Sequence, residues 1–221
     1  NRIDYERVRA VASRAVRDIP VTLIPSGPTH LSLFADMEGG RQLRDQSGVA
    51  HCTSGFTADR NGNPGLITAG HCPNNLRYQN TANTLQFGAQ AVGVDLQFHR
   101  RLPGHTVKPR FRAAAGDIRK VYSAENSPPG IIACKWGQST GYSCGTSSTY
   151  RNGCVGGLCG LDAISSLSTA PGDSGGPVFV GHSARGTVTG IGSIGGTVYD
   201  LITRIGRVQN SLGATVRTTT P

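Results

Sequence analysis

The chain has 221 residues, among them 31 glycines, with 16% charged residues and a formal net charge of +9. Such a length can bury a substantial core and allows one or two domains, and no run of about 18 apolar residues predicts a membrane-spanning helix. Frequent glycines, few charges and short apolar runs favour an all-β protein with many turns.

The basic residues are mostly arginines, and they gather in residues 7–17 and 99–112. A basic surface of this kind favours binding to polyanions or to acidic surfaces. No combination of aromatic and basic residues typical of nucleic-acid binding accompanies it. We therefore interpret the charge as an ordinary soluble surface and expect neither a nucleic-acid nor a membrane partner.

Six cysteines, an even number, are typical of three disulfides formed in an oxidising compartment. No Cys-x-x-Cys pair is present, so the sequence predicts no metal site, and nothing in it predicts a cofactor. The chain begins with Asn1 and shows no apolar signal-peptide segment. These features predict an extracellular protein whose chain has already been processed.

The first predicted element is an amphipathic helix over residues 4–19, with apolar residues on one face and arginines on the other. Pro20 ends this helix. Because the segment is unlike the glycine-rich remainder, we expect residues 1–34 to form an N-terminal extension. The apolar face of residues 4–19 needs an apolar partner, so we expect it to dock on a β-barrel of the protein.

A tight hairpin is predicted around Asn61-Gly62, because this dipeptide favours the two-residue turns that join antiparallel strands. The strand predicted before it, residues 49–56, carries Cys52. The strand predicted after it, residues 66–69, is followed by Cys72. We therefore expect a disulfide between these two cysteines, on neighbouring strands of one hairpin.

Two more strands are predicted in residues 85–98, the second with Asp95 inside an apolar run. Residues 99–117 are basic and contain two prolines, and we expect them to cross between two halves of the fold. A second run of strands is predicted from Ile118. After the extension, the chain therefore divides into a first half, residues 35–117, and a second half, residues 118–221.

The second half contains the other four cysteines. Cys134 and Cys144 bracket a glycine-containing segment and are expected to close a small hairpin, and Cys154–Cys159 follows by elimination. Later strands are predicted at residues 177–180, 185–192 and 196–202. A short C-terminal helix is predicted near Ile205, Val208 and Leu212, with Thr203 as its cap.

The segment Pro-Gly-Asp-Ser-Gly-Gly-Pro, residues 171–177, places Ser174 in a predicted tight turn. An exposed serine beside converging backbone N–H groups is what the nucleophile of an acyl transfer needs. Far upstream, His71 lies in Thr-Ala-Gly-His-Cys, and Asp95 follows it. A histidine near its ordinary pKa suits the base that such a serine requires.

The order His71, Asp95, Ser174, within these motifs and beside the Cys134–Cys144 hairpin, resembles the chymotrypsin-fold serine proteases. The similarity is to the bacterial secreted branch, streptogrisin and alpha-lytic protease, and it covers residues 35–213. It implies two Greek-key β-barrels with the active site between them.

The same resemblance implies roles for individual residues. Ser174 would be the nucleophile, His71 its general base and Asp95 the carboxylate that orients the imidazole. The backbone N–H groups of Gly172 and Ser174 would form the oxyanion hole. Family proteases mature by a cut before the segment that resembles Ala35 to Gly40. The extension is then either a pro-region remnant or an ordered part of a longer enzyme.

Three features depart from the family pattern. Gln138 stands where the family hairpin carries an arginine, so Asp173 lacks its expected counter-ion, unless another basic residue substitutes. The family's cysteine upstream of the nucleophile is missing, and so is its partner near residues 191–197. The pocket wall, usually Ser-Gly-Gly, aligns with Thr189-Gly190-Ile191.

The resemblance assigns the primary substrate pocket to Ser168, Thr189, Gly190 and Ile191. The Ile191 side chain would project across the pocket entrance, and no aspartate occupies the region around Ser168 at the pocket base. We therefore expect small or medium apolar residues, such as Ala, Val or Leu, before the cleaved bond.

The predicted function is a monomeric, secreted serine endopeptidase that acts on proteins or peptides. Two alternatives remain open at this point. One is an esterase-like or narrowly processing hydrolase that uses the same three residues. The other is a non-enzymatic binding protein on a protease fold, acting through its basic surface.

Overall fold

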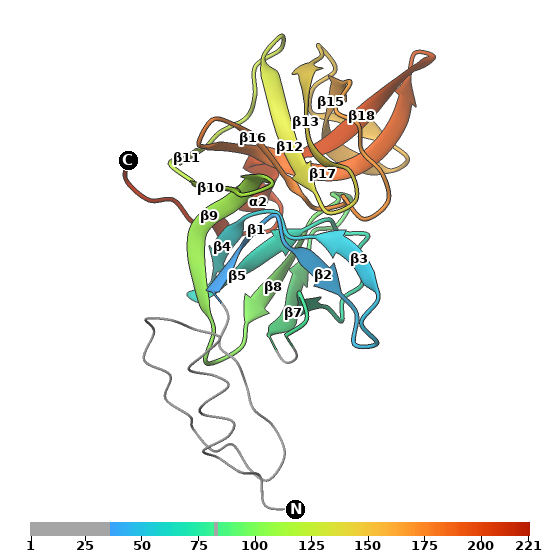
Figure 1. The fold of residues 1–221 in the computed structure, drawn as a ribbon. Coiled ribbons are helices and arrows are strands. Elements are labelled where there is room, and N and C mark those ends of the chain that lie inside the picture. The colour runs from blue at the N-terminus through green and yellow to red at the C-terminus, as the bar shows by residue number, and fades with distance from the viewer. Residues whose placement is uncertain (1–35, 82–83) are drawn as a thin grey trace, which may run out of the picture. The chain divides into compact units, whose positions relative to one another are not determined.

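The protein is described here by a computed structural model that covers residues 36–81 and 84–221. Within these ranges the protein is built almost entirely from β-strands (Figure 1). The extension predicted for residues 1–34, with its helix at residues 4–19, lies outside the described residues.

The strands fall into two groups, which Figure 1 shows one below the other. The N-terminal group forms a five-stranded sheet, β19-β4-β5-β8-β7, and two three-stranded sheets, β1-β9-β10 and β3-β2-β6. Its strands are β1 (Asp36–Gly39), β2 (Gln42–Arg44), β3 (Ala50–Thr53), β4 (Thr57–Arg60), β5 (Asn63–Thr68), β6 (Arg77–Tyr78), β7 (Leu85–Gln90), β8 (Gln97–Arg101), β9 (Thr106–Ala114) and β10 (Asp117–Lys120), with β19 (Thr215–Val216) from the C-terminus.

The C-terminal group contains a closed β-barrel. Strand pairing runs β12-β13-β15-β18-β17-β16 and returns from β16 to β12, so these six strands form a ring without free edges. The strands of this group are β11 (Ser123–Ala124), β12 (Ile132–Gly137), β13 (Gly141–Ser147), β14 (Gly153–Val155), β15 (Leu158–Ser165), β16 (Pro177–Val180), β17 (Ser183–Ile194) and β18 (Thr197–Arg204).

The β4–β5 hairpin turns at Asn61 and Gly62, whose φ angles are +50° and +73°. Both values lie in the left-handed region that a two-residue type I′ turn requires, and Asn-Gly is the dipeptide that adopts it at least cost. The predicted hairpin is therefore present, and it aims β5 toward the segment that carries His71.

Three sequence-based expectations were wrong. Residues 99–117 do not cross between halves, because they form the end of β8, all of β9 and the start of β10, which pairs with β9. Asp95 lies in the turn before β8, not inside a strand. Thr203 does not cap the short helix α2 (Gly206–Asn210), whose N-cap is Ile205 and which has no side-chain cap.

The largest cluster of buried apolar residues joins the two groups of strands. Phe111 of β9 packs against Phe179 of β16, with ring centroids 4.8 Å apart. Val208 of α2 and Leu212 after it are buried in the same cluster, and β19 then pairs with β4. The chain thus ends by returning to the N-terminal group, so its two halves share one core.

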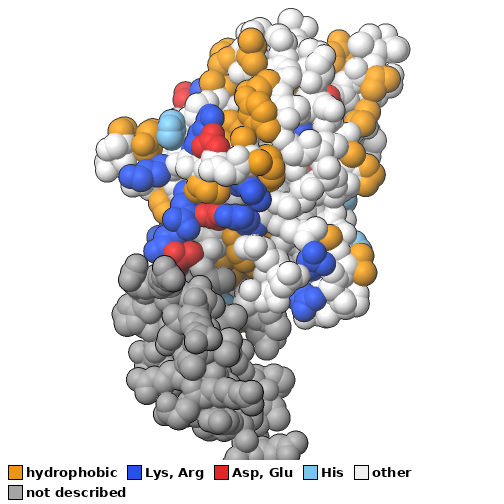
Figure 2. Space-filling model, in the orientation of Figure 1, with side chains coloured by type: hydrophobic (Ala, Val, Ile, Leu, Met, Phe, Trp, Pro, Cys, Tyr) orange, Lys and Arg blue, Asp and Glu red, His pale blue; other side chains and the backbone are white. Residues whose placement is uncertain are grey.

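Basic side chains lie beside acidic ones on the face that presents β9 and β10 (Figure 2). Arg110 and Arg41 both bind the buried Glu38 carboxylate, and Lys108 lies 3.8 Å from Asp36. The basic run of the sequence is therefore partly neutralised by its neighbours. In the described residues no helix is long and apolar enough to cross a membrane.

Candidate active site

Ser174 lies in a tight turn between residues 170 and 177, just before β16. The Asp173 N–H donates to the Ala170 carbonyl, and the Gly176 N–H donates to the Asp173 carbonyl, which closes the turn. The N-terminal group of strands holds it from outside, because the Thr53 N–H donates to the Ser174 carbonyl over 2.8 Å. The serine is thus fixed where the two groups of strands meet.

Glycine is required on both sides of this serine. Gly172 and Gly175 have φ angles of +99° and +81°. A Cβ atom on Gly172 would lie 2.2 Å from the Ser139 Oγ, and one on Gly175 would lie 2.0 Å from the Thr68 Oγ1. At both positions the left-handed backbone favours glycine. At Gly175 the Thr53 carbonyl and the Ala69 N, each 2.6 Å from such a Cβ, also exclude a side chain.

His71 follows β5 in the segment that the Cys52–Cys72 disulfide anchors. The preceding Gly70 lets the chain approach the next part of the site, since a Cβ there would lie 2.7 Å from the Leu96 N. As a result the His71 backbone N–H donates to Asp95 Oδ1 over 2.9 Å. The histidine is therefore positioned by its backbone as well as by its ring.

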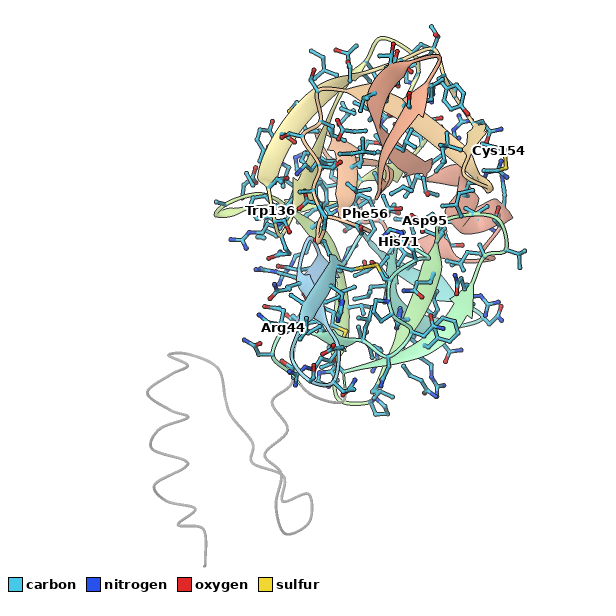
Figure 3. The ribbon with its side chains drawn as sticks, turned by 90° about the vertical axis from the view of Figure 1, so that its right-hand side faces the viewer. Arg44, Phe56, His71, Asp95, Trp136 and Cys154 are labelled. Carbon is cyan, nitrogen blue, oxygen red and sulfur yellow. A yellow bond between two sulfur atoms is a disulfide. The ribbon has the colours of Figure 1, made fainter. Side chains whose placement is uncertain are left out.

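The three candidate residues form a continuous hydrogen-bonded chain. His71 Nε2 lies 2.8 Å from Ser174 Oγ, and His71 Nδ1 lies 3.0 Å and 3.1 Å from the two oxygens of Asp95. The Asp95 side chain is only 1% exposed, whereas that of His71 is 48% exposed. Figure 3 shows His71 and Asp95 side by side where the two groups of strands meet.

The electrostatics of this chain favour a charged imidazole. The hydrogen bond that the His71 ring donates to Asp95 raises the pKa of His71 above its ordinary 6.5, and partial burial only partly opposes this. A carboxylate on one ring nitrogen also fixes the tautomer, leaving the other nitrogen free to accept a proton from Ser174. The arrangement can deprotonate a hydroxyl and hold the resulting positive charge.

The counter-ion of Asp173 is Lys135. Its Nζ lies 3.0 Å from Asp173 Oδ2, and both side chains are fully buried. The same carboxylate accepts hydrogen bonds from the Ser139 and Thr140 N–H groups and from the Thr140 hydroxyl. The buried carboxylate of Asp173, next to Ser174, therefore has its charge and its hydrogen-bonding capacity satisfied by protein groups.

These contacts also determine the protonation of Asp173. Burial alone would raise the pKa of this carboxyl, but the hydrogen bonds from Thr140 and Lys135 outweigh it and lower the pKa below its ordinary value of 3.8. Gln138 does not take part in this network, because its side chain donates to the Gly40 carbonyl instead.

Sequence reasoning missed Lys135, because the burial of its strand face is known only once β12 is placed in the fold. Ala133 and Lys135 occupy alternate positions of β12 and face the same side of the strand, where both are fully buried. A lysine on a buried strand face requires a carboxylate partner.

The structure joins the cysteines as Cys52–Cys72, Cys134–Cys144 and Cys154–Cys159, the pairing that the sequence predicts. The reasoning for the first pair was nevertheless wrong. Cys52 lies on β3, which pairs with β2, whereas Cys72 follows β5, which pairs with β4 and β8. This disulfide therefore links two sheets and not the two strands of one hairpin.

The four candidate pocket residues lie on two segments. Ser168 is exposed in the loop after β15, while Thr189, Gly190 and Ile191 lie along β17. The Thr189 hydroxyl is 2.9 Å from that of Thr203, which donates in turn to the Asp95 carbonyl. The Ile191 side chain is 61% exposed.

One expectation about this region was wrong, because an aspartate does lie beside Ser168. Asp200 of β18 is paired in register with Ile191, and its carboxylate accepts hydrogen bonds from the residues on either side of Ser168. The sequence does not reveal it, since Asp200 lies 33 residues from Leu167, its hydrogen-bond partner. In the described residues no cluster of three or more His, Cys, Asp and Glu side chains is placed to bind a metal ion.

Solved structures of several bacterial proteases share this fold. Cellulomonas bogoriensis chymotrypsin matches with a TM-score of 0.70 at 26% identity, over 84% of this chain and all of that one. Nocardiopsis protease matches with a TM-score of 0.70 at 28% identity, over 83% of this chain and all of that one. The described chain therefore has the fold of the chymotrypsin-like serine proteases.

Sequence comparison finds relatives among bacterial serine proteases. Streptogrisin-C of Streptomyces griseus is 32% identical over 181 residues, which cover 75% of this chain and 38% of that protein. Serine protease 1 of Streptomyces fradiae is 28% identical, over 88% of this chain and 54% of that protein. No family model matches the chain. The chain is thus a homologue of bacterial serine proteases of chymotrypsin fold, and it spans about half or less of the length of these two curated relatives.

Proposed function

We propose that this chain is a serine endopeptidase that hydrolyses peptide bonds through an acyl-enzyme, with Ser174, His71 and Asp95 as its catalytic triad. The observation that carries the proposal is the hydrogen-bonded chain from Ser174 Oγ through the His71 ring to the buried Asp95. A serine hydroxyl alone is a weak nucleophile, and these hydrogen bonds supply the base that it needs, His71.

The reaction follows from the position of each atom. His71 Nε2 accepts the Ser174 hydroxyl proton while Oγ attacks the carbonyl carbon of the substrate, and Asp95 stabilises the imidazolium that forms. The imidazolium then returns its proton to the leaving amine as the C–N bond breaks, which leaves an ester on Ser174. Water, deprotonated by His71, attacks this ester and releases the second product as the serine regains its proton.

The negative charge of the tetrahedral intermediate needs donors. We assign them to the backbone N–H groups of Gly172 and Ser174, in the turn that Asp173 and Lys135 anchor. The positive φ of Gly172 and the tight contacts of Gly175 support this assignment, because they fix the peptide units before and after the serine.

For the primary pocket we propose Ser168, Thr189, Gly190 and Ile191, with a preference for small or medium apolar residues before the cleaved bond. Ile191 is 61% exposed and therefore accessible to a substrate, and a branched side chain across the entrance would leave less room for a long or aromatic residue. One methylene changes binding in such a pocket by only about 1–3 kcal/mol, so the preference is graded. We also propose that the protein is secreted, which its three disulfides and its bacterial protease relatives support.

Hydrolysis of a denatured protein, with the cleavage sites read by mass spectrometry, tests the proposal. Wild type should cleave after Ala, Val or Leu, and Ser174→Ala should lose activity on the order of 10⁶-fold because the triad acts as a unit. Cleavage by Ser174→Ala at a rate near that of wild type would overturn the assignment. Hydrolysis of esters but not of any peptide would instead indicate an esterase.

A further inference from the structure

The loop after β15, residues 166–169, forms the proposed base of the primary pocket. Two of its residues, Ser166 and Ser168, have φ angles of +64° and +55°, which is a left-handed conformation that non-glycine residues adopt at a cost. Such a loop keeps its shape only when its surroundings hold it. No cysteine lies in it.

Asp200 of β18 holds the N–H side of this loop. Its Oδ2 accepts the Leu167 N–H over 2.8 Å, and its Oδ1 accepts the Thr169 N–H over 3.0 Å and the Thr169 hydroxyl over 2.6 Å. One carboxylate therefore spans Ser168 and binds the peptide groups on both sides of it. Asp200 is only 8% exposed.

The β12–β13 hairpin holds the carbonyl side of the same loop. The Ser143 hydroxyl donates to the Leu167 carbonyl, and the Thr140 hydroxyl, 2.8 Å from the Ser168 carbonyl, shares its single proton between this carbonyl and Asp173 Oδ2. The Thr140 N–H also donates to Asp173, the residue before the nucleophile. Asp200 and the turn of Ser174 are thus connected through one hydrogen-bonded loop.

The lone pairs of Asp200 are directed to this loop. Three donors occupy its two oxygens, and no lysine, arginine or histidine of the described residues forms a salt bridge with it within 4.0 Å. Charged hydrogen bonds of this kind are stronger than neutral ones. The carboxylate is therefore satisfied without a substrate and is well suited to fix the loop.

We infer that Asp200 is a positioning residue, which holds Leu167–Thr169 as the base of the primary pocket and does not serve as the counter-ion for a basic substrate side chain. The inference rests on the proposed peptidase function. The hydrogen bonds of the Asp200 carboxylate go to Leu167 and Thr169 and not to Ser174 or His71, so we expect it to act through the loop. Asp200 is paired in register with Ile191 of the neighbouring strand β17, so it joins the loop to the proposed pocket wall.

The test compares Asp200→Asn with wild type on four peptides that differ only in having Ala, Leu, Lys or Arg before the cleaved bond. Asn offers one acceptor where Asp offers two, so one side of the loop is released. A misplaced pocket base lowers kcat/KM on the order of 10–100-fold, and we expect the same factor for all four peptides, mainly through KM. Asp117→Asn on β10, the same change far from the loop, should leave all four values unchanged.

A small fluorophosphonate, which reacts with Ser174 without filling the pocket, separates positioning from loss of the catalytic chain. Its labelling rate should stay within about twofold of wild type in Asp200→Asn, because the hydrogen bonds of His71 are intact. If Asp200→Asn does not fold, as judged by circular dichroism, Thr169→Val removes only the hydroxyl contact and should lower kcat/KM in the same direction by a smaller factor.

Two results would overturn the inference. A selective loss of Lys and Arg cleavage in Asp200→Asn, with Ala and Leu cleavage unchanged, would make Asp200 a counter-ion. Unchanged kcat/KM for every peptide would remove any role in the pocket. Failure of the wild-type protein to react with the fluorophosphonate would instead contradict the proposed peptidase function. This outcome is distinct from the two that concern Asp200.

Discussion

Lys135 Nζ and Asp173 Oδ2 lie 3.0 Å apart, and neither side chain is exposed to solvent. The pair joins strand β12 to the turn that presents Ser174. It replaces the arginine pairing expected from Gln138, and it does so from a position three residues earlier in the hairpin. A buried carboxylate next to the nucleophile is thus stabilised by a cation from a different strand position than in the family pattern.

The first prediction concerns this pair. Lys135→Met keeps the apolar stem but removes the charge, so Asp173 is left buried without its cation. The free energy of unfolding should fall by about 3–5 kcal/mol, measured by urea unfolding at pH 7. The matched control is Lys120→Met at an exposed lysine of β10, which should change it by less than about 0.5 kcal/mol. Equal effects of the two substitutions would show that the buried pair adds nothing.

The second prediction concerns pH. Peptide cleavage requires neutral His71, and the hydrogen bond that its ring donates to Asp95 raises the pKa of His71. The kcat/KM should therefore rise with pH through a midpoint above 6.5. The free energy of unfolding should depend on pH in the opposite direction. The contribution of charged His71 is fully present below pH 6.5 and is lost as pH rises through its raised pKa.

Asp95→Asn tests the cause of that midpoint. Removing the carboxylate should move the midpoint to lower pH and reduce the plateau on the order of 10⁴-fold. Asp59→Asn, at a half-exposed aspartate paired with Arg217, is the matched control and should leave both unchanged. A midpoint that stays the same in Asp95→Asn would mean that another group controls the rate.

The third prediction separates backbone strain from close packing at glycine. Gly175 and Gly196 have nearly equal φ angles, +81° and +82°. A Cβ on Gly175 would lie 2.0 Å from the Thr68 Oγ1 and 2.6 Å from the Thr53 carbonyl, whereas a Cβ on Gly196 would meet nothing within 4 Å.

Gly196→Ala should therefore cost only the left-handed conformation, about 1–2 kcal/mol in thermal or urea unfolding. Gly175→Ala should cost clearly more, and it should also lower kcat/KM because the turn that holds Ser174 must move. Similar losses of stability in the two variants would argue that packing around Gly175 is looser than the structure shows.

The sequence predicted the features that depend on residues close together in the chain. The Asn61-Gly62 turn follows from two adjacent residues, and the glycines around Ser174 follow from the geometry of one loop. The Cys154–Cys159 hairpin closes over a separation of only five residues. In each case local backbone preference and final structure agree.

Features that depend on strand register were missed. Lys135 meets Asp173 across 38 residues and Asp200 meets Leu167 across 33, and neither contact can be read before the pairing of β12, β15 and β18 is known. The basic composition of residues 99–117 likewise concealed β9 and β10, because their charges face acidic partners from elsewhere in the fold. Long-range pairing, and not local propensity, decides such positions.

The most direct test of the central claim is fluorophosphonate labelling of the whole chain, followed by peptide mapping by mass spectrometry. The proposed triad predicts a single modified residue, Ser174, with labelling abolished in Ser174→Ala and strongly slowed in His71→Ala. Modification of a different serine, or no reaction in a folded wild-type protein, would contradict it.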